Sequence, residues 1–197
     1  AAGAAVSAGV ANLGRDAREM IRIVDYDAAW PAMFDAEAAA LRGALGALAL
    51  RIEHVGSTAV PGLAAKPVID IQVSVAALAP LAPWVERLAA LGYVHEPLGD
   101  FDRVYPFFKK PAAWPHTHHV HLCAVGGQQE RRHLAFRDAL RADAALAAEY
   151  LALKRALAAA HGGGSAAARE AYSLAKSPFV DAALARAGGV APPRMAP

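Results

Sequence analysis

Cysteine, charge of one sign and long apolar runs are all scarce in this 197-residue sequence. The single cysteine, Cys123, excludes an internal disulfide and cannot form a zinc knuckle without a second thiol. Lys+Arg 20 against Asp+Glu 18 leaves no charge excess for an extended nucleic-acid or membrane surface, so any anion site must be local. No apolar run approaches the ~20 residues that span a bilayer. These absences favour a cytoplasmic protein.

Alanine supplies 52 residues, so the hydrophobic fraction of 56% overstates the area that the core can bury. The larger apolar residues still suffice for one domain, which we place at 21–187. Residues 1–20 lack periodicity and 188–197 are rich in Pro and Gly, so both segments are expected to be flexible. The chain begins with Ala1 rather than methionine, which suggests an excerpt of a longer protein or a processed end.

Hydrophobic periodicity predicts alternating helices and strands in the first half and helices in the second. Strands are expected at 50–55, 68–75, 104–108 and 118–125, a turn at 111–115, and helices at 30 to about 48, 81–91, 134–141, 144–160 and 166–187. The predicted fold class is therefore α+β, with a short mixed sheet flanked by helices.

The strand predicted at 68–75 places apolar side chains on one face and Asp70, Gln72 and Ser74 on the other. A carboxylate, an amide and a hydroxyl on one face of an apolar strand are unfavourable unless that face meets a cleft or solvent. The polar face of this strand is therefore expected to line a site.

Gly56, Ser57 and Thr58 follow the strand predicted at 50–55. Glycine lets the backbone approach a phosphate closely, and the two hydroxyls add donors next to free backbone N–H groups. Asp70, at the start of the next strand, offers a hard oxygen ligand for Mg²⁺. A tight turn and a capping carboxylate are the alternative, purely structural roles of these residues.

Twelve residues separate Ser57 from Asp70, and this spacing resembles the polymerase-β-like nucleotidyltransferase motif, a Gly-Ser followed by a strand with an Asp-x-Asp pair. The resemblance implies the polymerase-β-like nucleotidyltransferase fold and a Mg²⁺ site. Position 72 departs from the motif, because Gln72 is neutral and a poor Mg²⁺ ligand, whereas a two-metal mechanism needs the second carboxylate.

Residues 54–71, HVGSTAVPGLAAKPVIDI, resemble the signature of the GrpB family more specifically. Further family-like pieces follow in order, so that the resemblance covers about 21–185: Gly92-Tyr93, the basic and aromatic segment 103–109, the histidine segment 118–121, Phe136-Arg137-Asp138, and the Tyr-x-x-x-Lys pairs Tyr150 with Lys154 and Tyr172 with Lys176. The family is grouped with nucleotidyltransferases by fold. In some bacteria its domain follows a dephospho-coenzyme A kinase, which implies a link to coenzyme A biosynthesis.

Four histidines crowd residues 116–121, and in a strand His119, His121 and Cys123 share one face. Two imidazoles at this period could ligate Zn²⁺ or another transition metal, bind phosphate, or deprotonate an acceptor hydroxyl. The alternative is that these side chains are exposed or hydrogen-bonded to one another. A histidine-triad hydrolase would need a third histidine where Cys123 stands.

The sequence has only five lysines against fifteen arginines, and three of the lysines, Lys66, Lys154 and Lys176, stand in motif positions. The two Tyr-x-x-x-Lys pairs are expected one turn apart on single helix faces, with the tyrosines as either core aromatics or ligand contacts. Arg103 and Lys109 could reach the same anion from a strand or loop. Arg137 is either an anion ligand or the partner of Asp138 on a helix surface.

The sequence thus predicts a nucleotide-binding protein that transfers a nucleotidyl group from a nucleoside triphosphate, or acts on a related phosphorylated small molecule, with an unidentified acceptor. Asp70 is the predicted Mg²⁺ ligand, and His119 and His121 complete the metal shell or act as the base. The predicted phosphate ligands are Gly56, Ser57, Thr58, Lys66, Arg103, Lys109, Arg137, Lys154 and Lys176. The alternatives are a non-catalytic module that binds a nucleotide or a coenzyme A derivative, and a metal-dependent phosphohydrolase built on the histidines.

Overall fold

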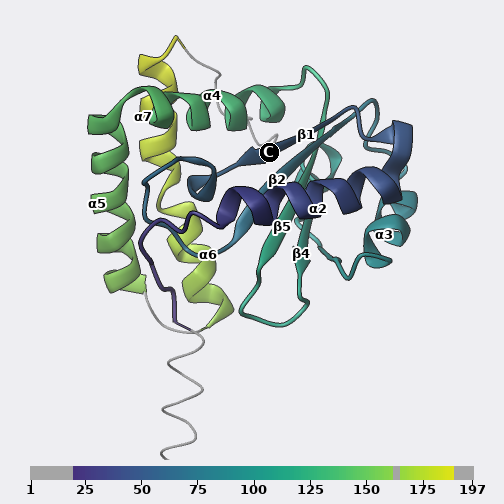
Figure 1. The fold of residues 1–197 in the computed structure, drawn as a ribbon, viewed down its shortest axis with the longest axis horizontal. Helices are drawn as coiled ribbons and strands as arrows, with labels where there is room; N and C mark the ends of the chain where they lie inside the picture. Colours follow the sequence, from purple (N-terminus) through teal and green to yellow (C-terminus); the bar gives the residue numbers. More distant parts are fainter. Residues whose placement is uncertain (1–19, 162–164, 189–197) are drawn as a thin grey trace, which may run out of the picture.

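The computed structural model describes residues 20–161 and 165–188, so the segments 1–20 and 188–197, predicted to be flexible, lie almost entirely outside the described residues. The elements along the chain are α2 (Trp30–Leu45), the 3-10 helix η1 (Gly46–Leu48), β1 (Arg51–Val55), η2 (Ser57–Ala59), β2 (Ile69–Val75), α3 (Ala82–Ala89), β3 (Val94–Glu96), η3 (Gly99–Arg103), β4 (Phe107–Lys110), β5 (His118–Ala124), α4 (Gln128–Ala142), α5 (Ala144–His161), α6 (Ala166–Leu174) and α7 (Ser177–Arg186) (Figure 1).

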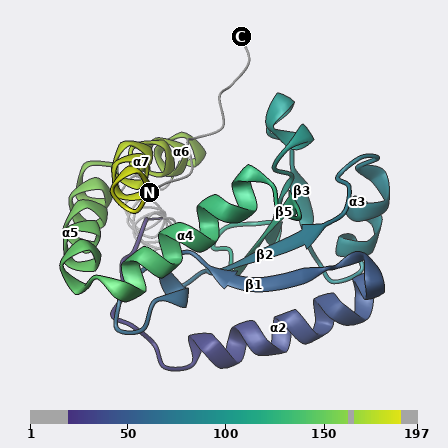
Figure 2. The ribbon, with the colours of Figure 1, turned by 90° about the horizontal axis from the view of Figure 1, so that it is seen from above.

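The strands form one five-stranded sheet in the order β1-β2-β5-β4-β3. β2 and β5 are parallel, whereas the other neighbouring strands are antiparallel. Figure 2 shows α2 below one face of the sheet, α4 across the other face, and α5, α6 and α7 together at one end. The predicted α+β class, with a mixed sheet flanked by helices, is confirmed.

One face of the sheet supplies the main core. The apolar residues of β2 alternate inward as predicted and are all fully buried, and they pack with side chains of α2, α3 and the neighbouring strands, including Leu41, Trp84, Phe108 and Val120. The opposite face carries the polar residues of β2 and β5, over which α4 passes. Packing on the first face therefore fixes the position of the polar groups on the second.

Several element boundaries differ from the prediction. The helix predicted at 166–187 is two helices, because Pro178 in the first turn of α7 cannot continue α6. Consequently Tyr172 lies in α6 and Lys176 precedes α7, so this pair does not lie within one helix. The helix predicted at 134–141 begins at Gln128, where the Glu130 carboxylate accepts a hydrogen bond from the Gly126 N–H.

The strand predicted at 104–108 starts later, at Phe107, and Arg103 belongs to the 3-10 helix η3. The Asp102 carboxylate accepts a hydrogen bond from the Leu98 N–H and holds this turn, which was not recognised in the sequence. The short strand β3 was also missed, since three residues give too little periodicity to detect.

Across residues 20–161 and 165–188, none of the helices combines the length and the apolar character that crossing a bilayer requires.

Candidate metal and phosphate site

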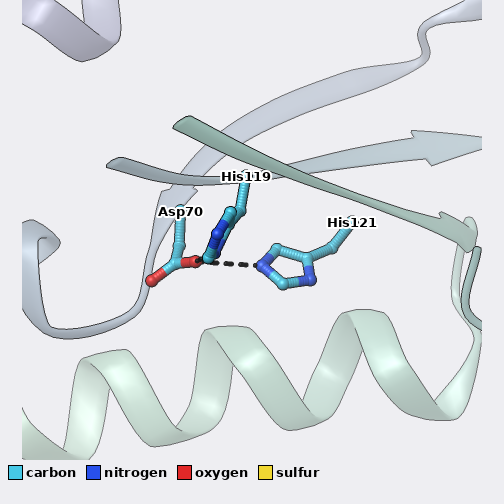
Figure 3. A group of neighbouring side chains, drawn as sticks. All are labelled: Asp70, His119 and His121. Atoms are coloured by element: carbon cyan, nitrogen blue, oxygen red, sulfur yellow. Dashed lines mark hydrogen bonds and ion pairs between the residues drawn. The ribbon is translucent and has the colours of Figure 1, made fainter. Parts of the chain in front are cut away.

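The parallel register of β2 and β5 brings a carboxylate and two imidazoles together. Asp70 is the register partner of His119, and His121 lies two residues further along β5 on the same face. The Asp70 Oδ1 atom is 3.1 Å from His119 Nδ1 and 3.1 Å from His121 Nε2. Figure 3 shows the three side chains pointing toward one another. The predicted juxtaposition of the histidines with Asp70 is therefore present in the fold.

The charges within this group are strongly coupled. Burial alone would raise the Asp70 pKa, but hydrogen bonds and charge from His119 and His121 outweigh burial and hold that pKa well below its usual range. Burial lowers the His119 pKa, against the opposing effect of Asp70. An ionised carboxylate beside an imidazole whose pKa burial lowers suits metal binding, because metal ligands must be deprotonated.

Two further side chains hold the histidine rings in place. The Tyr105 hydroxyl is 2.6 Å from His121 Nδ1, and His116 Nδ1 is 3.1 Å from His119 Nε2. One nitrogen of each ring thus faces Asp70, where a metal ion would be shared with the carboxylate, while the other nitrogen of each ring contacts a different side chain. Hydrogen bonding of the distal ring nitrogen is the usual way in which proteins fix the tautomer of a metal-ligating histidine.

Within the described part of the chain, Asp70, His119 and His121 are a group whose ligand atoms all lie within 4.8 Å of one another. Separations near 3 Å are those of donors at ~2.1 Å from a common ion. Two imidazoles with one carboxylate match the preferences of Zn²⁺, Fe²⁺ or Mn²⁺, whereas Mg²⁺ prefers oxygen ligands throughout. The donor set therefore fits the transition-metal expectation better than the Mg²⁺ expectation.

A cavity of about 810 Å³ opens over this group. Among the residues that line it are Gly56, Ser57, Thr58, Lys66, Asp70, His119, His121, Lys154 and Lys176. Most of the predicted site residues, drawn from segments far apart in the sequence, thus share one cavity.

Gly56 brings the turn after β1 against Asp70. Its φ of +70° lies in the region that favours glycine, and a Cβ added here would sit 2.5 Å from Asp70 Oδ2. Ser57 lies next to it and lines the cavity together with Tyr150. The Thr58 hydroxyl is already committed, because it donates to the Val68 carbonyl and lies 3.0 Å from His54 Nε2. Of the two hydroxyls, Ser57 is the one better placed for a ligand.

Three lysines meet two tyrosine rings at one end of the cavity. The Lys66 and Lys176 ammonium groups lie 5.1 and 4.7 Å from the centre of the Tyr172 ring, and the Lys154 ammonium lies 5.0 Å from that of Tyr150. Lys154 is only 2% exposed and donates to the Ala64 carbonyl at 2.5 Å. None of the three forms a salt bridge with an Asp or Glu within the described residues.

Burial and mutual repulsion destabilise these cations. Burial, followed by the charge of Lys176, lowers the Lys154 pKa to about 7, and burial together with the charge of Lys66 lowers the Lys176 pKa to about 8. Burial also lowers the Lys66 pKa. An anion in the cavity would offset both the burial of the lysine charges and their mutual repulsion. This end of the cavity is therefore suited to phosphate.

Gln72 stands where the nucleotidyltransferase motif has its second carboxylate. It is fully buried, and its Oε1 atom is 2.8 Å from His133 Nδ1 on α4. The side chain therefore joins the sheet to α4, and β2 supplies no second carboxylate beside Asp70 for a two-metal site.

Three predicted phosphate ligands lie outside the cavity lining. The Arg103 side chain is 84% exposed and pairs with Asp100, and Lys109 pairs with Glu96. Arg137 donates to Glu53 and to Asp138, so it has the structural role that the sequence left open as the alternative. Pairing with carboxylates satisfies these cations within the protein.

Several cavity residues were not singled out in the sequence, among them Tyr105, Gln129 and Arg132. Gln129 and Arg132 lie three residues apart in α4, a helix whose predicted start fell after both of them. Polar residues three positions apart are common on the solvent-exposed faces of helices. Their spacing was therefore too weak a signal to identify Gln129 and Arg132 as site residues.

The buried side chain of His54, which contacts the cavity residue Thr58, makes the stability of the fold depend on pH. It is 9% exposed, stacks on Phe34 and bonds Thr58, and burial lowers its pKa from 6.5 to about 4. His54 is therefore harder to protonate in the folded protein than in the unfolded chain. Its neutral form contributes to the free energy of unfolding above pH 6.5, and this contribution, ~3 kcal/mol at most, is lost as the pH falls toward 4. Urea unfolding at pH 7 and pH 4.5 should show a smaller acid loss for His54→Gln than for the wild type. Equal losses in the two proteins would contradict this role.

Known proteins resemble the chain throughout the described region. A sequence model described as GrpB protein matches residues 20–186. The UPF0157 protein YqkA of Bacillus subtilis is 35% identical over 144 residues, which cover 73% of this chain and 41% of YqkA. A dephospho-CoA kinase of Mycolicibacterium paratuberculosis is 35% identical over 194 residues, which cover 87% of this chain and 47% of the kinase. The chain thus spans less than half the length of either relative.

Among solved structures, the crystal structure of the conserved protein GrpB from Enterococcus faecalis resembles this fold with a TM-score of 0.70 and 35% sequence identity. The likeness covers 85% of this chain and 99% of that one.

Proposed function

The chain belongs to the GrpB family, and from this premise we propose that its cavity binds a nucleotide, or a closely related phosphorylated small molecule, beside a divalent transition-metal ion and transfers its nucleotidyl or phosphoryl group. One observation supports the proposal above the others. A group of two histidines and one aspartate shares a cavity with three lysines that form no salt bridge within the described residues.

The residues divide the work between positioning and charge. Backbone N–H groups at Gly56 and Ser57 approach the phosphates, and Lys66 and Lys176 neutralise their charge. Asp70, His119 and His121 would hold the metal, which when bound polarises a phosphoryl oxygen and lowers the pKa of a coordinated water or hydroxyl. Tyr105 orients His121 through the 2.6 Å contact with its Nδ1 atom.

The proposal retains the polymerase-β-like nucleotidyltransferase fold as an interpretation of the Gly56-Ser57 turn and the Asp70 strand. It differs from the usual chemistry of that fold, because Gln72, buried against His133, stands on β2 where the motif has its second carboxylate. A single ion held by mixed nitrogen and oxygen ligands takes the place of a pair of Mg²⁺ ions.

Binding is tested by calorimetric titration of ATP into protein loaded with Mn²⁺ or Co²⁺. Lys66→Met and Lys176→Met should each weaken ATP binding by ~10- to 100-fold, the loss expected for a charge-assisted hydrogen bond. Lys109→Met is the matched control, because its ammonium pairs with Glu96 outside the cavity. Equal weakening by all three substitutions, or no ATP binding by the wild type, would refute the phosphate site.

The reaction is tested by following pyrophosphate and inorganic phosphate separately with nucleoside triphosphates, acceptor alcohols and Mn²⁺, Co²⁺, Zn²⁺ or Mg²⁺. Pyrophosphate release that depends on the acceptor identifies nucleotidyl transfer, and acceptor-independent release of phosphate identifies a phosphohydrolase.

The second candidate function is a binding module without catalysis, and the replacement of the second carboxylate by the buried Gln72 favours it. Relatives named dephospho-CoA kinase make coenzyme A derivatives natural probes. Under this candidate, nucleotide or coenzyme A binding raises the midpoint of thermal unfolding, by ~2.7 kcal/mol of stabilisation at 100-fold the Kd, with no turnover for any metal.

A further inference from the structure

Two polar atoms near the start of α4 are buried without a partner. Gln129 Oε1 and Arg132 Nη1 have no hydrogen-bond partner among the described residues, and both side chains line the cavity. The Arg132 guanidinium is nevertheless held in place, because its Nη2 atom donates to Asp181 on α7. A held donor and an unpartnered acceptor therefore belong to side chains that line the same cavity.

Unpaired buried polar atoms are rare in folded proteins, because each one loses its water without gaining a partner. Gln129 and Arg132 lie three residues apart and share a face of α4. A ligand with an acceptor beside a donor would satisfy both at once. A bare phosphate chain offers acceptors only, so it would leave the Gln129 oxygen unmet.

Aromatic and apolar side chains also line the cavity. They include Leu98 and Phe101 of the η3 region with Tyr105 and Phe107, and the Tyr105 ring lies 5.6 Å from that of His133, the residue after Arg132. The lysines belong to the other end of the cavity, where they contact Tyr150 and Tyr172. The metal-ligand group is connected to both sets of residues, since Tyr105 bonds His121 and the charges of Lys66 and Asp70 interact.

We infer that the end of the cavity between α4 and the η3–β4 region binds the base of a nucleotide, with Gln129 and Arg132 hydrogen-bonding to its edge. The aromatic side chains of this end contact the face of the base, and the phosphates extend past Asp70 to the lysines. A base edge carries adjacent donors and acceptors, and its faces stack on aromatic rings. The inference rests on the proposed function, because it assigns the other end to phosphate.

The test compares ATP, GTP, CTP, UTP and inorganic tripolyphosphate by calorimetry with the whole chain. The wild type should bind at least one nucleotide more tightly than tripolyphosphate and should discriminate among the four bases. Gln129→Met removes the acceptor at similar size, and Arg132→Lys keeps a cation beside Asp181 while removing the fork of donors. Each should weaken the preferred nucleotide by about tenfold and leave tripolyphosphate within about twofold.

Arg131→Lys is the matched control, since Arg131 is exposed on the same helix and should change neither ligand. Tripolyphosphate bound as tightly as every nucleotide overturns the base site and leaves the phosphate site standing. Equal weakening of nucleotide and tripolyphosphate in Arg132→Lys makes Arg132 an anion ligand and also overturns the inference. Failure of every probe, tripolyphosphate included, overturns the proposed function itself.

Discussion

Replacing Asp70 by asparagine is expected to weaken the binding of Co²⁺ or Zn²⁺ by more than ~100-fold, since even residues that only orient metal ligands contribute ~10- to 100-fold. Asp70 supplies the one carboxylate of the group, and its Oδ1 atom faces both imidazoles at 3.1 Å. Asparagine keeps the size of the side chain but removes the charge. Calorimetry gives the affinity, and the visible absorption of Co²⁺ reports the number and type of ligands.

The chain offers a matched control for this substitution. Asp102 is also paired with a histidine, since its Oδ1 atom is 3.2 Å from His95 Nε2, but Asp102 is not among the residues that line the cavity. Asp102→Asn should leave metal affinity unchanged. The metal site is disproved if wild-type protein takes up no stoichiometric ion, or if Asp70→Asn binds the ion as tightly as the wild type.

Replacing Gly56 by alanine should reduce both stability and ligand binding. The new Cβ would lie 2.5 Å from Asp70 Oδ2 and 3.0 Å from Asp70 Cβ, so either the turn or the carboxylate must move. The positive φ of +70° adds a backbone penalty. We expect a loss of ~1 to 3 kcal/mol in the free energy of unfolding by urea, together with at least tenfold weaker metal binding.

Gly62→Ala separates the two effects. Gly62 has a φ of +78°, but a Cβ built there would have no atom within 4 Å. Its substitution carries the backbone penalty of ~1 kcal/mol without a collision, and metal binding should be preserved. If Gly56→Ala lowers the free energy of unfolding and the metal affinity no more than Gly62→Ala does, the close approach of the turn to Asp70 is not needed for metal binding.

Sequence patterns predicted which side chains share a face wherever side-chain direction repeats at a fixed period along the backbone. Alternation along β2 and β5 placed Asp70 on the polar face of one strand and His119 with His121 on one face of the other, and the structure confirms both. The strand period of two is a property of the backbone, so it can be read without knowing the neighbours. Arg103 and Lys109 show the limit, because pairing with Asp100 and Glu96 depends on the fold around them.

By itself the sequence determined the α+β class, the family, and the residue types available for a phosphate and metal site. Only the tertiary structure decided which of these residues share one cavity. The parallel pairing of β2 with β5 sets Asp70 beside His119, and the helices at the end of the sheet bring Lys154 and Lys176 to the turn at Gly56. α4 adds Gln129 and Arg132 from above the polar face. Strand order and helix docking depend on contacts between distant segments, which no local period encodes.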